Sequence, residues 1–89
     1  MALIIFTQQL ARFLPVPQFE TDATTLRNAL DAVATAHPRL AAYVLDDQGR
    51  LRANVVAFVD GRRCRDRALL DDPLRPGSTI HILQALSGG

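Results

Sequence analysis

One amphipathic segment, residues 26–34, limits the possible folds of this chain more than any other feature. Apolar residues recur there at intervals of three and four, the spacing of a single buried stripe on a helix. The stripe consists of Leu26, Ala29, Leu30, Val33 and Ala34. Thr24 or Thr25 can cap the helix, and Pro38 ends it. A chain with one such stripe needs a sheet to cover it.

The other apolar or β-branched segments predict strands at residues 2–7, 16–21, 54–59, 62–65 and 78–83. The first lacks alternation, which is typical of a strand covered on both faces. Pro17 makes the second an edge strand, because proline donates no ladder hydrogen bond. Asp60-Gly61 predicts a two-residue hairpin turn. Residues 38–43 predict a short helical turn that begins with proline.

These elements predict an α+β fold with the order strand, strand, helix and three further strands. The first and last strands are the most apolar, so we expect them side by side at the centre of the sheet. Between them, the loop 69–76 is expected to direct Leu70 and Leu74 inward. Residues 1–83 are assigned to one domain and residues 84–89 to a flexible tail.

Composition excludes several classes of function. The chain of 89 residues has ten arginines, no lysine and nine acidic residues, so its net charge of +1 does not suit an electrostatic nucleic-acid binder. The apolar N-terminus is short and has no basic stretch before it, which excludes a signal peptide or a membrane span. The single cysteine, Cys64, indicates a reducing compartment, and we expect the protein in the cytoplasm.

Few side chains suggest chemistry. Arginines beside Cys64 would lower its pKa and activate the thiol, but a half-buried structural cysteine is the favoured interpretation. His37 is expected to lie at the helix C-terminus as a cap, and it is too far from His81 in sequence to suggest a metal site. No spacing resembles a catalytic triad or a phosphate loop. The sequence therefore predicts no bound metal and no enzymatic activity of its own.

Two surfaces are candidates for protein contacts. The run 62–67 is rich in arginine, and we interpret it first as a solvated face and second as a docking surface for an acidic partner. In the expected strands 54–59 and 78–83, alternate side chains point to opposite faces of the sheet, so residues that face the helix can be separated from those on the open face. The open-face residues, expected to dock a partner, are Val56, Phe58, His81 and Leu83.

Three stretches carry a family resemblance. Residues 54–61, residues 72–83 and the helix 25–36, together with the terminal Gly88-Gly89, resemble the MoaD/ThiS-type sulfur carriers. The resemblance implies a ubiquitin-like β-grasp fold, with a mixed sheet on one main helix. The tail departs from the family, which often has Pro-Ala-Val-Ala-Gly-Gly, and Asn28 stands where many members have glutamate.

The resemblance also implies a function centred on Gly89. A ubiquitin-activating-type adenylating enzyme would use ATP to activate the terminal carboxylate, and a persulfide sulfur donor would convert it to a thiocarboxylate. Leu86, Ser87 and Gly88 would thread the tail into partners, and glycine suits a narrow channel because it has no Cβ. The chain itself would bind no cofactor.

The acceptor of the sulfur stays open. An acceptor synthase subunit would make molybdopterin, cysteine or another sulfur metabolite, or a thiazole, and the chain could be the small subunit of molybdopterin synthase. The long connection 46–54 resembles carriers of the cysteine-synthesis kind. One alternative is a ubiquitin-like modifier joined through Gly89 to lysines of target proteins. Another is a non-covalent interaction domain whose tail has no role.

Overall fold

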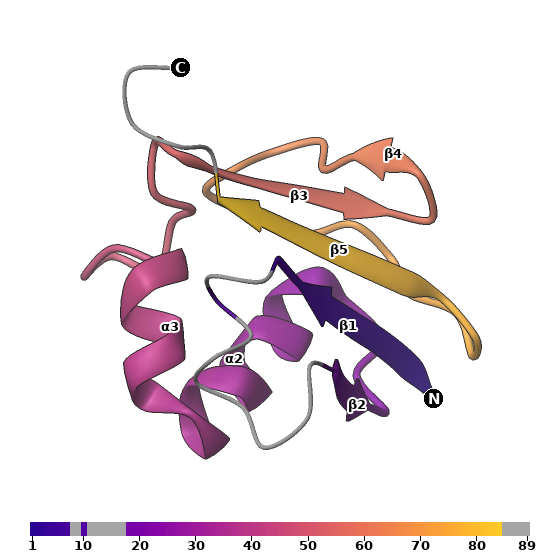
Figure 1. Cartoon of the computed structure of the whole chain (residues 1–89). Helices are drawn as coiled ribbons and strands as arrows, with labels where there is room; N and C mark the ends of the chain where they lie inside the picture. The colour runs from indigo at the N-terminus through magenta and orange to yellow at the C-terminus, as the bar shows by residue number, and fades with distance from the viewer. Residues whose placement is uncertain (8–9, 11–17, 85–89) are drawn as a thin grey trace.

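A mixed β-sheet with helices on one side forms the fold of this protein in the computed structural model (Figure 1). The structure describes residues 1–7, 10 and 18–84. The strands in these ranges are β1 (Ala2–Phe6), β2 (Gln18–Thr21), β3 (Val55–Val59), β4 (Arg62–Arg63) and β5 (Thr79–Gln84), and the helices are α2 (Leu26–Ala36) and α3 (Pro38–Val44). The predicted α+β class and the predicted order of these elements are confirmed.

Sheet topology places the first and last strands next to each other, as the apolar pattern predicted. In the described residues the strand order is β2-β1-β5-β3-β4. β1 and β5 are parallel, with Ile4 opposite Ile80, whereas every other neighbouring pair is antiparallel. The parallel pair is possible because the long connection through α2 and α3 returns the chain to the same end of the sheet.

The helices cover only one face of the sheet. In β1 the residues Ala2, Ile4 and Phe6 are buried, but Leu3 and Ile5 are partly exposed. The prediction that this strand is covered on both faces is therefore wrong. Its apolar run indicated two covered faces, but the described helices leave one of them open.

Local signals explain the helix boundaries. The Thr25 hydroxyl accepts a hydrogen bond from the Asn28 backbone N–H at 3.1 Å, so Thr25 rather than Thr24 caps α2. Pro38 begins α3 in its first turn, where its missing N–H costs nothing. The predicted short turn is a helix of seven residues, and it buries Leu40, Ala41 and Val44.

Several predicted strand boundaries differ from the observed ones by a residue or more. β4 stops at Arg63, because Cys64 turns into the core and Arg65 binds Asp72. Gln84, assigned to the tail, is the last residue of β5 and lies opposite Val55. The predicted inward positions of Leu70 and Leu74 are confirmed, since both side chains are buried. The expected flexibility of residues 85–89 falls outside the described part of the chain.

Candidate functional site

The chain reaches its C-terminal residues from the middle of the sheet. β5 is paired on both sides, with β1 and with β3, as far as Ile82, and its last two residues pair with β3 alone, up to the pair Val55–Gln84. Five residues follow Gln84 in the sequence. The predicted sites at Gly89, Gly88, Ser87 and Leu86 lie outside the described residues, and their roles stay predictions. What the structure describes is the paired strand β5 that precedes them in the chain.

The four predicted docking residues come together on the open face of the sheet. Val56 lies directly opposite Leu83, and Phe58 lies opposite His81. Directly paired side chains in antiparallel strands are neighbours on the same face. Leu83 is 37% exposed, His81 is exposed, and Val56 and Phe58 are partly exposed. The four side chains thus form a mixed apolar and polar patch beside the last residues of β5, and we refer to them as the open-face patch.

Residues of the neighbouring strands extend this face. Ile5 lies opposite His81, and Arg63 lies opposite Phe58, so one row crosses four strands from β1 to β4. Leu3 lies two residues before Ile5 in β1 and therefore on the same face of the sheet. These residues were missed because β1 was interpreted as covered on both faces. The expected pairing of β1 with the last strand, combined with the alternation of side chains along β1, could have identified Leu3 and Ile5.

A carboxylate fixes the opposite end of β5. Asp60, in the turn after β3, accepts hydrogen bonds from the Thr79 backbone N–H and the Ser78 hydroxyl, both at 2.9 Å. These hydrogen bonds favour the charged form and lower the pKa of Asp60. Asp60 has a φ of 50°, and Gly61 follows at 85°, which are the positive values that the predicted Asp-Gly hairpin requires.

Cys64 is a core residue. Its side chain is buried within the hydrophobic cluster. Burial and the nearby Asp72 charge raise the pKa of the thiol, and the charges of Arg67 and Arg63 do not offset them. An activated thiol is therefore contradicted, because Cys64 is buried in the core while its neighbours Arg62, Arg63 and Arg65 are exposed. The favoured structural interpretation is confirmed.

His37 also has a structural position. Its backbone N–H donates to the Val33 carbonyl oxygen at the C-terminus of α2, as expected of a cap. Its ring packs edge-on against Phe19, with 5.7 Å between centroids. Among the described residues, no group of histidine, cysteine and acidic side chains is arranged to hold a metal ion. Within the same residues, no helix is both long and apolar enough to cross a membrane.

Solved structures with this fold are similar over nearly their whole length. SAMP1 from Haloferax volcanii has a TM-score of 0.79 at 24% identity, with 99% of this chain and 98% of that chain covered. A chain of the Amycolatopsis orientalis BexX/CysO complex has a TM-score of 0.85 at 19% identity, with both chains fully covered at 100%. CysO from Mycobacterium tuberculosis has a TM-score of 0.82 at 16% identity, covering 97% of this chain and 100% of that one. These similarities establish the ubiquitin-like β-grasp fold.

The sequence itself matches the ThiS family over residues 4–89, from β1 to the terminal glycine. No curated protein sequence matches it significantly. The family match and the fold support a role as a small sulfur carrier or ubiquitin-like modifier. A match that spans all but the first three residues settles the classification: this chain belongs to the ThiS family, and its fold is that of the MoaD/ThiS-type ubiquitin-like proteins.

Proposed function

We propose that this protein carries sulfur on its C-terminal carboxyl, as a thiocarboxylate at Gly89. The observation that supports this proposal is the extent of the family match, which includes the terminal Gly88-Gly89. The path of β5 agrees with it, because this central strand directs the chain towards those glycines. Five residues after Gln84 reach at most about 17 Å when extended, so the carboxyl can enter a partner while the sheet stays outside.

The chemistry requires activation, because a carboxylate is a poor electrophile. A ubiquitin-activating-type adenylating enzyme joins the Gly89 carboxylate to AMP from ATP, and pyrophosphate leaves. The terminal sulfur of a donor persulfide then displaces AMP, and a thiol reductant cleaves the remaining S–S bond to release the thiocarboxylate. The carrier itself holds no cofactor in this scheme, since the adenylating enzyme binds ATP. The reducing cytoplasm is the compartment that suits these thiol steps.

The open-face patch is the proposed contact with these partners. Leu83 lies at the end of β5 nearest to the tail, so an enzyme that binds Gly89 can also cover Leu83 and Val56. The Amycolatopsis complex of BexX and CysO supports partner proteins for a chain of this fold. The acceptor is a synthase subunit that makes molybdopterin, cysteine, a thiazole or another sulfur metabolite.

Intact-mass measurement tests the carrier proposal. The protein is incubated with its adenylating enzyme, ATP and a persulfide donor. We expect a mass gain equal to the exchange of one oxygen for sulfur, located at Gly89 by fragmentation. A variant that lacks Gly88 and Gly89 is the control and should not gain this mass. Full biosynthetic function of that truncated variant would contradict the proposal.

A second candidate is a ubiquitin-like modifier conjugated through Gly89. The similar solved structures include small archaeal modifier proteins from Haloferax volcanii and Methanosarcina acetivorans. In the same incubation, a modifier gives adducts linked to lysines of other proteins rather than a free thiocarboxylate. The chain has no lysine, so it cannot build chains on its own side-chain amines.

Paired leucine substitutions test the open-face patch. Burying a leucine fully contributes about 1.5–3 kcal/mol, so covering the 37% of Leu83 that is exposed contributes about 0.6–1.1 kcal/mol. We therefore expect Leu83→Ser to weaken binding to the adenylating enzyme about three- to sixfold. The control is Leu69→Ser, in a loop outside the open face and 62% exposed, which should leave affinity unchanged. Equal losses in both variants would contradict the assignment.

A further inference from the structure

An arginine-lined groove lies at the end of the sheet opposite to the tail. It separates the β3–β4 hairpin from the loop that leads into β5, and its volume is about 670 Å³. Its charged walls consist of Arg62, Arg63, Arg65, Arg75, Asp60 and Asp72. Four cations against two carboxylates give the groove an excess of positive charge, although the whole chain is nearly neutral.

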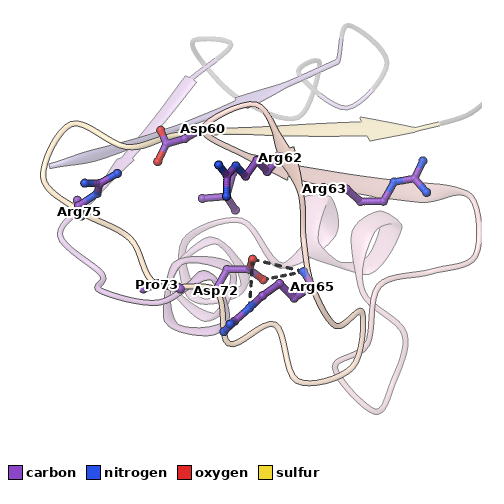
Figure 2. A pocket seen from close by; sticks show the side chains of 8 residues that line it. Asp60, Arg62, Arg63, Arg65, Asp72, Pro73 and Arg75 are labelled. Atoms are coloured by element: carbon purple, nitrogen blue, oxygen red, sulfur yellow. Dashed lines mark hydrogen bonds and ion pairs between the residues drawn. The ribbon is translucent and has the colours of Figure 1, made fainter.

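The two carboxylates already have partners within the chain. Asp60 binds the Thr79 N–H and the Ser78 hydroxyl. Asp72 is buried and accepts from the Arg65 backbone N–H at 3.1 Å, and the Arg65 side chain lies 3.9 Å from it. In Figure 2 this contact lies on one wall of the groove. These contacts hold both carboxylates in place. The Arg75 charge helps to lower the pKa of Asp60, but the two side chains form no close ion pair.

Arg62 and Arg75 are the available cations. Both are exposed, and neither guanidinium forms a hydrogen bond or a close ion pair with any described residue. Figure 2 shows Arg62 extending into the hollow from β4 and Arg75 from the opposite wall, whereas Arg63 points away. The hollow thus offers two guanidinium groups from two separate elements of the fold.

This arrangement suits separated carboxylates better than one phosphate. A phosphate site usually combines converging cations with free backbone N–H or hydroxyl donors. Here two backbone donors of the lining residues are already used, because the Arg65 N–H donates to Asp72 and the Arg75 N–H donates to the Ser78 hydroxyl. Arginine binds carboxylates through two parallel N–H groups, and an extended peptide can present two acidic side chains to the two walls.

We propose that this groove binds an acidic, extended segment of a partner protein, with Arg62 and Arg75 as its carboxylate contacts. Val59 pairs with Ile80 at this end of β5, and Val55 pairs with Gln84 at the other, so about 13 Å of strand separates the groove from the start of the tail. A partner can therefore occupy the groove while the tail enters an enzyme. The proposal does not depend on the chemistry at Gly89.

Peptide titration of the full-length protein tests this proposal. The probe is a fluorescein-labelled peptide of alternating glutamate and serine, whose acidic side chains share one face when the peptide is extended. We expect Arg62→Gln and Arg75→Gln each to weaken binding about three- to tenfold, because both arginines are exposed and solvent can replace part of each charged contact. The matched control is Arg39→Gln, an exposed arginine on α3 outside the groove, and it should change affinity less than about twofold.

Two further titrations separate the groove from general charge attraction and from a phosphate site. A peptide with glutamine in place of glutamate should not bind, and pyrophosphate should compete only weakly. Equal losses for Arg39→Gln and Arg62→Gln would overturn the proposal, because the attraction would then be non-specific. Binding of the glutamine peptide, or preferred binding of pyrophosphate, would overturn it as well. Circular dichroism of each variant verifies that it is folded.

Discussion

Arg27 should contribute more to the stability of the native state than its position on the polar face of α2 suggests. Its Nη2 donates to the Gly49 carbonyl oxygen at 2.7 Å and to the Ala68 carbonyl oxygen at 2.8 Å. Its Nη1 lies 3.8 Å from Asp31. One side chain thereby joins the helix to two loops that are 22 and 41 residues away in sequence.

The expected cost of Arg27→Met follows from these contacts. A hydrogen bond from a charged group contributes about 1.5–3 kcal/mol when shielded from water, and less when solvent can replace it. The Arg27 side chain is 28% exposed, so each of the two contacts is expected to contribute about 1–1.5 kcal/mol. The exposed ion pair with Asp31, one turn along the helix, adds only about 0.3 kcal/mol. We expect the free energy of unfolding to fall by about 2–3 kcal/mol, and Tm to fall by roughly 10–20 °C.

Urea unfolding monitored by circular dichroism measures this loss. Methionine keeps much of the apolar stem but removes the donors, so packing changes little. The control, Arg39→Met, removes an exposed arginine from α3 and should stay within about 0.5 kcal/mol of the original protein. An Arg27→Met variant as stable as that control would refute the reasoning. The loops would then be held by buried Leu51 and Leu70 and by the backbone hydrogen bonds around them.

Three further predictions concern the cap, the carboxylates and the thiol. Thr25→Ala removes the hydroxyl that caps α2, so urea unfolding should show a loss of about 1 kcal/mol, whereas Thr24→Ala should have little effect. Hydrogen bonds lower the pKa of Asp46, Asp60 and Asp66 below the ordinary 3.8. The stability that these carboxylates contribute should therefore be present above that pH and lost as the pH falls below it. A urea midpoint independent of pH in that acid range would contradict this expectation. Burial raises the pKa of Cys64 above 9.0, so a thiol reagent near pH 8 should modify the native protein far more slowly than the urea-unfolded chain, and equal rates would contradict the buried position.

Much of the candidate docking face could be predicted from local patterns. Alternation in the late strands assigned Phe58 and Leu83 to the open face, and the structure places them there beside His81 and Val56. The same reasoning failed for β1, where an apolar run was interpreted as two covered faces. Leu3 and Ile5 are partly exposed because sequence hydrophobicity does not specify what packs against each face.

The sequence alone determined the features that depend on neighbouring residues. The stripe from Leu26 to Val33 and the threonine before it specify α2, and Asp60-Gly61 specifies the hairpin. These signals act over a few residues, through hydrogen bonds and backbone dihedrals that the local sequence controls. The family resemblance, which includes the terminal glycines, was also present in the sequence.

Only the tertiary structure decided which distant residues meet. Arg27 reaches Gly49 and Ala68 across the fold, and Arg62 faces the same groove as Arg75. Such contacts depend on where loops lie after the sheet and helices have packed, so no periodicity in the sequence encodes them. The same reason explains Cys64: its arginine neighbours in sequence suggested a reactive thiol, but packing turned the sulfur into the core and raised its pKa.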